Sequence, residues 1–445
     1  MKAKRFVWIA IYFLSPLVVA GLIFAARPGG LSNPGYVLSV LLGAAAYVWL
    51  VNQFVISARP KFIERNFGMD NLYRFHGIMA TVSVVLGFVH SRIKESLTGF
   101  EPRVAQIGLL LFGVVVLAGS FFLVDSFLRR IKPLEKFRKF LVDRLGFKRK
   151  LSVLLHNFSL VPITLILLHV IRTGAAFLSP AVKWVYIGYF ALGMAFYVYH
   201  QFIRRWLMKK NPYHVVENKA EAKDVRTLTI APKNGKVFDY QPGQFALITV
   251  VNGRVQKESH PFTITSSPSR PESISFSIKA SGDFTGMLDK VVEGDEVRID
   301  APYGVFSYLN YPEENELVFI AGGIGVTPFL SVLRYLRDKD PQRKVTLLWG
   351  ARTQEDLVRR EELDAIAADM PHFSWIPVLS HEDGWPGETG FFDGEKLERL
   401  ALQDRDLPTT GFYTCGPPIM MKIVSGTLAE KGVAKERIHF EKFAF

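Results

Sequence analysis

The chain of 445 residues contains one cysteine, Cys415. One cysteine excludes an intrachain disulfide and any zinc or iron–sulfur site that is built from several cysteines, and it suits a reducing compartment. Internal repeats and low-complexity tracts are also missing from the sequence, as is a calcium-binding DxDxDG loop. Activation by calcium through an EF-hand in this chain is therefore not expected.

Charged residues are scarce in residues 1–203, where six runs approach the roughly 20 apolar residues that a membrane-spanning helix needs. These runs predict an all-α bundle of six transmembrane helices within residues 1–210, surrounded by membrane lipid. The first run follows a basic stretch, as in a secretory signal, but its apolar core is longer than the usual ~7–15 residues, so we expect no cleavage. The runs are 6–26, 36–56, 72–91, 104–126, 151–171 and 183–203.

Lys and Arg are unevenly distributed among the connecting segments. The N-terminus and segments 57–71, 127–150 and 204–210 carry most of them, whereas the alternate segments carry few. Because cytoplasmic loops are enriched in Lys and Arg, both termini and the C-terminal half are expected in the cytoplasm, with the bundle in a bacterial-type inner or plasma membrane. The net charge is +13. The basic residues concentrate beside the apolar runs rather than on one face of the soluble half, which argues against nucleic-acid binding.

Two runs each contain a pair of histidines, His76 with His90 and His156 with His169. Ionisable groups inside a membrane are costly and usually functional, and neutral imidazole is a common axial ligand of haem iron. Spacings of 14 and 13 residues separate the members of each pair by about 20 Å along a helix, as two stacked haems require. The two helices run in the same direction, so we expect His76 to face His156 on the inner side and His90 to face His169 on the outer side. Histidines that only relay protons would also satisfy the pattern.

The fifth run is predicted to be distorted. On an ideal helix a step of 13 residues turns the side chain by about 140°, against about 40° for 14 residues. Pro162 lies almost midway between the two histidines of this run, where it removes a backbone donor and kinks a helix. We therefore expect an irregular turn near Pro162. His200, in the sixth run, has no histidine at matching depth and is expected to be structural.

From residue 213 onward, short β-patterned runs precede alternating strand and helix patterns. This order predicts a small antiparallel β-barrel over residues 211–312, followed by an α/β nucleotide-binding domain with a parallel sheet over residues 313–445.

The segment ELVFIAGGIGVTPFLSVLRYL, residues 316–336, has the pattern of a strand, a glycine-rich turn and a helix. Such a turn lets the backbone approach a pyrophosphate, whose charge is met by the first amides of the helix. Arg352 ends a second strand, where its cation suits a ribose phosphate such as the 2′-phosphate of NADPH, with a surface ion pair as the alternative. A third strand ends in CGPP. The expected nucleotide contacts are Gly322, Gly323, Gly325, Thr327, Pro328, Arg352, Cys415, Gly416 and Pro417.

Two segments of the barrel domain suit a flavin. HPFTITSSP at 260–268 places an aromatic ring between a histidine and several hydroxyls, and KASGDFTGML at 279–288 supplies a cation and a turn at a helix start. In isolation, these segments are equally consistent with a strand and two polar turns. The candidate flavin contacts are His260, Pro261, Phe262, Thr263, Ile264, Thr265, Ser266, Lys279, Gly282, Asp283 and Thr285.

Together, the four histidines at these spacings, HPFT, GGIGVTP and CGPP resemble the ferric reductase and NADPH oxidase superfamily over almost the whole chain. Members of that superfamily join a six-helix transmembrane domain with two b-type haems to a cytoplasmic ferredoxin–NADP reductase-like module that holds FAD. The resemblance implies that HPFTITS contacts the isoalloxazine and ribityl groups and that residues 279–285 contact the flavin phosphate. It also implies four haem ligands, His76, His90, His156 and His169.

A C-terminal aromatic residue covers the flavin ring in this superfamily and moves aside for the nicotinamide. Phe445 is the first candidate for that role here, and Phe443 is the second. Some members carry a bulky aromatic residue between the ligands of the fifth helix, where this chain has Pro162 and Ile163. The resemblance therefore does not supply the route between the haems.

The implied activity is electron transfer from cytoplasmic NADPH, or NADH, through FAD and the two haems to an acceptor on the outer side. FAD is needed because a nicotinamide gives up two electrons as a hydride, whereas each haem carries one. Since both axial positions of each iron are filled, the acceptor would react at the haem edge, which makes superoxide from O2 the first candidate product and reduction of a ferric chelate the second. Arg92, with Arg27, Lys94 and Arg172, lies at the predicted outer mouth and would attract anions or anchor at lipid headgroups.

Two other assignments share part of this pattern. A flavocytochrome subunit that feeds a separate periplasmic reductase would show most of the same features. A haem-based sensor or a transporter with a regulatory nucleotide domain would not need the flavin segment. The sequence identifies no protein partner.

Overall fold

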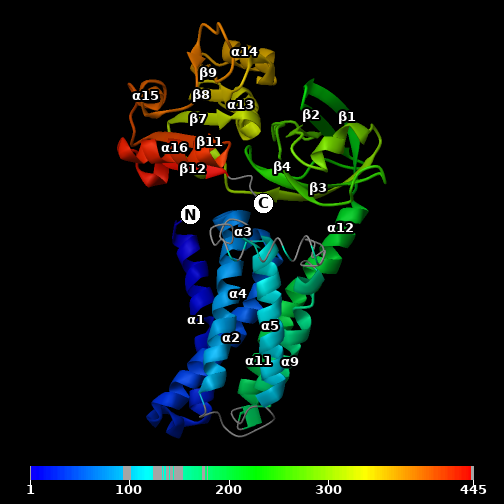
Figure 1. The fold of residues 1–445 in the computed structure, drawn as a ribbon, viewed down its shortest axis with the longest axis vertical. Coiled ribbons are helices and arrows are strands. Elements are labelled where there is room, and N and C mark those ends of the chain that lie inside the picture. Colours follow the sequence, from blue (N-terminus) through cyan, green and yellow to red (C-terminus); the bar gives the residue numbers. More distant parts are fainter. Residues whose placement is uncertain are drawn as a thin grey trace. The chain divides into compact units, whose positions relative to one another are not determined.

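The computed structural model describes residues 2–93, 102–123, 154–172, 176–177 and 179–441, with the single positions 133, 135, 136, 140 and 144. The chain divides into two compact units, Met1–Arg204 and Arg205–Phe445, both drawn in Figure 1.

The first unit is helical in its described residues, as the apolar runs predict. Helix α2 packs against α1, α4 and α11, and α5 packs against α4 and α9. Many large apolar side chains also remain exposed on the outer faces of these helices, a pattern typical of helices that are hydrophobic on all sides. The elements are α1 (Lys2–Ala26), η1 (Pro28–Ser32), α2 (Pro34–Ser57), α3 (Lys61–Phe67), α4 (Met69–Arg92), α5 (Pro102–Leu123), α9 (Leu160–Val170), α11 (Pro180–Val198), η2 (Tyr199–Ile203) and α12 (Arg204–Lys210).

Within the described part of the chain, four helices are long and apolar enough to cross a membrane, judged by length and composition. Two shorter apolar helices, Arg103–Leu117 and Leu154–Val170, fall on the two other predicted runs. The four long ones are Lys4–Ala26, Pro34–Ser57, Met69–Arg92 and Pro180–Lys210.

The predicted irregular turn in the fifth run is confirmed. Residues 154–157 are helical, 158 and 159 form a turn, and α9 starts at Leu160. Pro162 has no N–H with which to reach the carbonyl of Phe158. That carbonyl instead accepts a bond of 3.0 Å from the amide of Val161, three residues along.

The second unit begins with a six-stranded antiparallel sheet in the order β4-β3-β6-β1-β2-β5. Its edges meet where the amide of Thr265 donates to the carbonyl of Ser275 at 2.8 Å. This closure confirms the predicted barrel. The elements are β1 (Tyr213–Ala222), β2 (Val225–Pro232), β3 (Phe245–Val251), β4 (His260–Thr263), β5 (Ile274–Lys279), η3 (Thr285–Lys290), β6 (Glu296–Tyr303) and η4 (Tyr308–Asn310).

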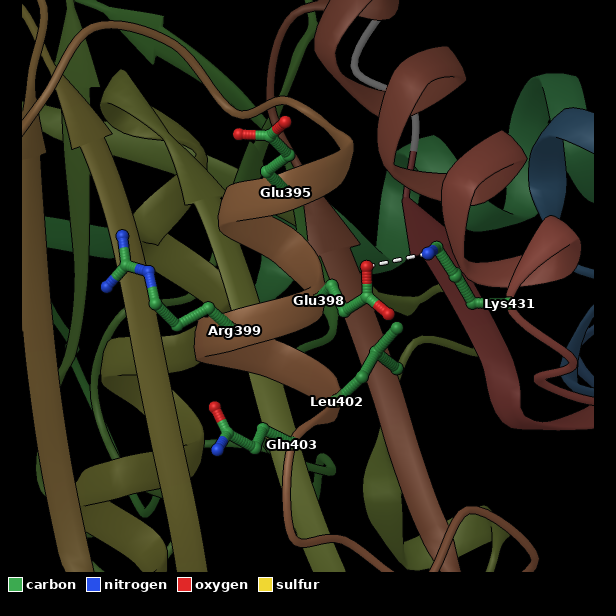
Figure 2. A pocket seen from close by; sticks show the side chains of 6 residues that line it. All are labelled: Glu395, Glu398, Arg399, Leu402, Gln403 and Lys431. Carbon is green, nitrogen blue, oxygen red and sulfur yellow. Dashed lines mark hydrogen bonds and ion pairs between the residues drawn. The ribbon is translucent and has the colours of Figure 1, made fainter.

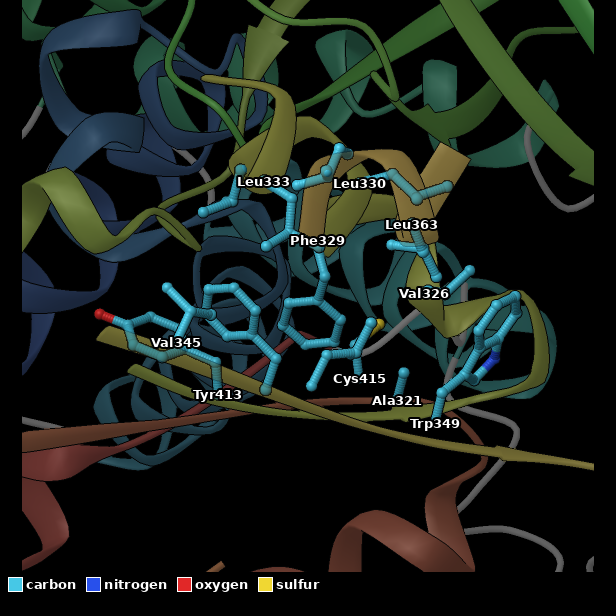
Figure 3. Close-up of a cluster of buried hydrophobic side chains, with 14 of the residues drawn as sticks. Ala321, Val326, Phe329, Leu330, Leu333, Val345, Trp349, Leu363, Tyr413 and Cys415 are labelled. Atoms are coloured by element: carbon cyan, nitrogen blue, oxygen red, sulfur yellow. The ribbon is translucent and has the colours of Figure 1, made fainter. Parts of the chain in front are cut away.

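A parallel sheet in the order β10-β9-β8-β7-β11-β12 follows, which confirms the predicted α/β domain. Strands β7 and β11 are buried along their whole length, as parallel strands covered on both faces should be. Figure 3 shows one covering layer, in which side chains of α13 lie over Tyr413 and Cys415. The elements are β7 (Glu316–Gly322), η5 (Gly323–Val326), α13 (Thr327–Lys339), β8 (Lys344–Ala351), η6 (Gln354–Asp356), α14 (Arg360–Asp369), β9 (Phe373–Leu379), β10 (Glu388–Thr389), α15 (Gly394–Leu397), η7 (Glu398–Leu402), β11 (Thr410–Cys415), α16 (Pro418–Glu430), η8 (Lys435–Arg437) and β12 (Ile438–Glu441).

Candidate functional site

Strand β7 lies in the middle of the parallel sheet, between β8 and β11. The chain passes from β7 through α13 to β8 on one side, whereas β11 is added later on the other side, so the strand order reverses between β7 and β11. Ligands of open α/β sheets bind outside the carboxyl ends of the strands at such a reversal. The loops after these two strands, Gly323–Val326 and 416–417, therefore mark the candidate nucleotide site.

The glycines of the β7 loop have different roles. A Cβ at Gly325 would lie 2.3 Å from the carbonyl oxygen of Cys415, and one at Gly322 would lie 2.7 Å from Cδ of Pro417. These two glycines are therefore required by packing between the two loops. Gly323 has a φ of +54° and open space where a Cβ would be. Of the three glycines expected to approach a pyrophosphate, Gly323 leaves its backbone most accessible.

Helix α13 starts with Thr327 and Pro328, both of which are buried. The hydroxyl of Thr327 donates to the carbonyl of Ile324 at 3.0 Å, so it supports the loop. The N-cap residue, Val326, makes no side-chain cap bond. The amide of Thr327 already donates to the carbonyl of Ile324, and Pro328 has no N–H. The first two helical residues therefore offer no amide to a phosphate, and the accessible backbone at Gly323 is the main group that this loop presents.

Cys415 points into the apolar core beneath α13 (Figure 3) and is fully buried. Burial, and secondarily the charge of Glu441, raise the pKa of the Cys415 thiol well above its ordinary value. The thiol is therefore neutral at physiological pH. Contact between this residue and a nicotinamide would be made by its backbone.

Cys415 is expected to resist alkylation in the folded protein. At pH 8.5 iodoacetamide should label it at least about tenfold more slowly than in the unfolded chain, because the thiolate is the reactive form and its formation is suppressed by burial. Mass spectrometry measures the labelling directly, since the chain has one cysteine. Equal labelling rates in both states would contradict this placement of the thiol.

Arg352 follows the buried strand β8 and is 63% exposed in its side chain. Its Nε donates to Asp356 at 3.2 Å. Partial burial raises the pKa of Asp356, but the hydrogen bond and charge of Arg352 outweigh it, so this pKa lies below its usual value. The structure is therefore consistent with both expected roles of Arg352. Its side chain forms a surface ion pair, and its exposed cation at the end of β8 is also accessible to a phosphate.

The C-terminal strand β12 runs toward the same edge of the sheet. Its Glu441 pairs in register with Cys415 of β11. Phe443 and Phe445, the candidate aromatic shields, lie outside the described residues. Their predicted position at the flavin ring stays a prediction.

In the barrel, His260 and Phe262 share an aromatic group with Phe284. The rings of His260 and Phe284 stack at 4.1 Å, and those of Phe262 and Phe284 lie 6.2 Å apart at 22°. Pro261, between them, is partly exposed. A flat, partly exposed aromatic surface of this kind suits stacking on a flavin ring.

The residues after β4 contribute mainly through their backbone. Thr263, Ile264 and Thr265 are buried, and the hydroxyl of Thr265 donates to the carbonyl of Ser275 at 2.9 Å. The hydroxyl of Ser266 bonds Tyr240 at 3.1 Å. These two hydroxyls form hydrogen bonds within the protein, and the ligand contacts expected for this stretch stay a prediction.

The candidate phosphate turn lies between β5 and η3. The Thr285 hydroxyl accepts bonds from the amides of residues 281 and 282 and so fixes the turn, while Gly282 and Asp283 are exposed. Lys279, the expected cation, pairs with Asp224 at 3.1 Å. Since the amides of residues 281 and 282 are used within the turn, the paired Lys279 is the cation that this turn offers to a phosphate.

The inner histidines lie together in the helical unit. The ring centroids of His76 and His156 lie 5.8 Å apart, and the ring planes meet at 73°. In both rings the Nδ1 atom is buried and has no hydrogen-bond partner. Buried polar atoms are normally paired. The arrangement brings together two residues that are 80 positions apart in the sequence.

Of the outer pair, His90 lies in α4 and His169 lies in α9. Nδ1 of His90 lies 2.9 Å from the carbonyl oxygen of Ser39. A proton on Nδ1 donated to this carbonyl leaves the Nε2 lone pair available to a metal. Gly43 makes room for the ring, because a Cβ there would lie 2.9 Å from Cε1 of His90. No sequence motif marks Ser39 or Gly43, whose roles depend on the packing of α2 against α4.

Arg92, in the last turn of α4, is exposed. Among the described residues, no group of three or more His, Cys, Asp or Glu side chains could hold a bare metal ion.

A shallow hollow lies between η7 and the C-terminal end of α16 (Figure 2). The ion pair Glu398–Lys431, at 2.6 Å, crosses it. It contains none of the candidate site residues, so we assign it no part in the site.

Two known domains match adjacent parts of the chain. Residues 208–307 match an FAD-binding domain, and residues 319–426 match an oxidoreductase NAD-binding domain. The reductase component of propane 2-monooxygenase from Rhodococcus jostii is 30% identical over 226 residues, which are 50% of this chain and 60% of that protein. The glycine betaine monooxygenase reductase subunit of Pseudomonas aeruginosa is 29% identical over 246 residues, 54% of this chain and 65% of that subunit. This chain thus spans less than two thirds of the length of these relatives.

Similarity in structure is found for the same half. The flavohaem-like FAD/NAD-binding domain of nitric oxide dioxygenase from Vibrio cholerae O1 biovar El Tor has a TM-score of 0.47 and 26% identity. The alignment covers 52% of this chain and 97% of that domain.

Proposed function

Because residues 208–426 contain FAD-binding and NAD-binding domains that together define a ferredoxin–NADP reductase-like flavin oxidoreductase, we propose that the chain carries electrons from cytoplasmic NADPH through FAD and two b-type haems to an acceptor across the membrane. The observation that carries the proposal is the facing pair His76 and His156 inside an apolar helical unit. A reductase that delivered electrons only to soluble partners would not need such a pair.

The inner histidines fit a haem. The rings of His76 and His156 lie 5.8 Å apart, so the two residues would hold one haem iron between them. Neutral imidazoles are the form that binds iron. We therefore assign these two residues as the axial ligands of the inner haem.

The outer histidines fit a second haem. The carbonyl of Ser39 orients the ring of His90 through Nδ1, as outer-sphere carbonyls orient metal-ligating histidines. Gly43 keeps the space that this ring occupies. We propose that His90 and His169 would hold the second, outer haem.

The bound cofactors supply the conversion of a two-electron hydride into single electrons. The chain's own residues bind and orient them. In this proposal the backbone at Gly323 holds the nucleotide phosphates, and the aromatic group of His260, Phe262 and Phe284 contacts the flavin. Phe445 is proposed to cover the flavin ring and to move aside for the nicotinamide.

We propose O2 as the outer acceptor, with superoxide as the product, because bis-histidine ligation leaves only the haem edge for one-electron transfer. Arg92 and its neighbours at the outer ends of the helices would favour release of the anion. In purified protein with FAD and haem, NADPH should drive cytochrome c reduction that superoxide dismutase abolishes. Rapid reduction of a ferric chelate without that sensitive component would contradict the oxidase and identify a ferric reductase. A tight external partner copurifying with the helical unit would instead favour a flavocytochrome that feeds another reductase.

Arg352 is expected to set the preference for NADPH. The Arg352→Ala variant should lower kcat/KM for NADPH by about tenfold and leave that for NADH unchanged, since one charge-assisted bond to a phosphate is worth about 1.5–3 kcal/mol. The matched control is Arg360→Ala, which removes a nearby cation that bonds Gln354. An unchanged ratio of the two kcat/KM values in Arg352→Ala would contradict this role.

A further inference from the structure

Helix α13 joins the candidate nucleotide loop to the candidate flavin segment within one compact unit. Its first residue follows directly on the loop Gly323–Val326. Further along, Ser331, Arg334 and Asp338 recur at spacings of three and four residues, so they lie on one face of the helix. All three bond to the stretch 265–269, which continues strand β4.

These bonds fix the main chain of that stretch. The hydroxyl of Ser331 donates to the carbonyl of Ser266 at 2.7 Å. Nη1 of Arg334 donates to the carbonyl of Thr265, and the hydroxyl of Ser269 donates to Asp338. Two of the three acceptors are backbone carbonyls, so the helix determines the path of the chain that leaves the flavin segment.

Arg334 is itself held in place by Glu362 of α14. Its Nε and Nη2 donate to the two carboxylate oxygens of Glu362 at 2.6 and 2.7 Å, the bidentate geometry that a guanidinium favours. Glu362 also faces Arg359 at 3.6 Å, and Arg359 pairs with Glu221 of β1 at 2.6 Å. Arg334, Glu362, Arg359 and Glu221 thus form a chain of alternating charge. It contacts the barrel at both ends, through the carbonyl of Thr265 and through Glu221 itself.

The opposite face of α13 is apolar and packs on the parallel sheet. Phe329, Leu330 and Leu333 are fully buried there, in the cluster that also contains Tyr413 and Cys415 (Figure 3). Since close-packed interiors resist displacement, α13 cannot shift over the sheet without disrupting this core. The helix is therefore a rigid link between the two subdomains.

We propose that Arg334 is a positioning residue for hydride transfer, which holds residues 265–269, and with them the flavin, at a fixed distance from the nucleotide loop. The inference rests on the proposed reduction of FAD by NADPH. Arg334 acts through the main chain of Thr265 rather than by touching a reactant. A misplacement of about 1 Å between reacting groups costs roughly 100-fold in rate, so loss of this contact should affect the transfer step more than binding.

The test uses the full-length protein in detergent with FAD and haem bound. In Arg334→Met, the single-turnover rate of FAD reduction at saturating NADPH should fall by about 10- to 100-fold, and the isotope effect with NADPH deuterated at C4 should rise. The dissociation constant of NADPH should change by less than about threefold, because the phosphate-binding loop is intact. Without any nucleotide, amide hydrogen exchange in residues 263–269 should become faster.

Lys339→Met is the matched control, because it removes a cation from the same helix at an exposed position outside the bonds to residues 265–269. It should behave as the wild-type protein in every measurement. A wild-type rate of FAD reduction in Arg334→Met, or a loss of rate that merely follows loss of bound FAD, would overturn the inference. If NADPH and NADH both failed to reduce FAD in the wild-type protein, the proposed function would itself be contradicted, and the inference with it.

Discussion

Replacing His90 by alanine should remove one of two haems and stop electron flow to the outer acceptor, while FAD reduction by NADPH continues. Loss of an orienting partner of a metal ligand typically costs 10–100-fold, so loss of the ligand itself should lower outer-acceptor reduction by at least about 100-fold. The pyridine haemochrome assay should fall from two haems per chain to one. Reduction of ferricyanide added to the cytoplasmic module should stay near the wild-type rate.

His200→Ala is the control for this experiment, because it removes another histidine from an apolar helix without touching either assigned pair. It should retain two haems and wild-type rates. Two haems per chain in His90→Ala would contradict the assignment of the outer ligands. An equal loss in His200→Ala would show that any histidine removed from these helices disturbs the fold.

The second large effect is expected at Gly325. In Gly325→Ala the new Cβ would lie 2.3 Å from the carbonyl oxygen of Cys415 and 2.7 Å from its carbonyl carbon. Both are backbone atoms of a buried strand end, so the clash cannot be relieved by turning a side chain. Overpacking of this kind costs about 1–3 kcal/mol. Displacement of the loops by about 1 Å would slow hydride transfer by roughly 100-fold.

The measurement is the single-turnover rate of FAD reduction, together with the FAD content. Since the barrel has its own core, Gly325→Ala should still bind FAD. Gly426→Ala in α16 is the control, because nothing lies within 4 Å of a Cβ there and alanine is favoured over glycine inside a helix. A wild-type rate in Gly325→Ala would show that the packing of the two loops does not position the nucleotide.

The elements were predictable from the sequence where one local pattern decided them. In the described residues, the apolar runs form helices and the β-patterned runs form the barrel. The segments with alternating strand and helix patterns form the parallel sheet and its helices. The turn at residues 158 and 159 followed from Pro162, whose missing N–H acts only on its own helix. In each case the cause and the effect lie within a few residues of each other.

The functions of single residues in the candidate site were less predictable, because they depend on contacts between distant segments. A GGIG sequence does not reveal that Gly325 is required by the backbone of Cys415, 90 residues later. The sequence suggested the hydroxyl of Thr265 as a ligand contact, but in the structure this hydroxyl donates to the carbonyl of Ser275, where the barrel closes. Ser39, Gly43 and Arg334 carried no sequence signal, since their partners lie more than 25 residues away.

The central proposal is that electrons from NADPH reach two haems held by facing histidine pairs. Its most direct test is an anaerobic difference spectrum of the purified protein with NADPH, calibrated by the pyridine haemochrome assay. We expect two b-type haems per chain, both reduced by NADPH through bound FAD to the same extent as by dithionite. Two results would contradict the proposal. One is a protein that contains no haem although the cells that made it had sufficient haem, and the other is bound haem that dithionite reduces but NADPH does not.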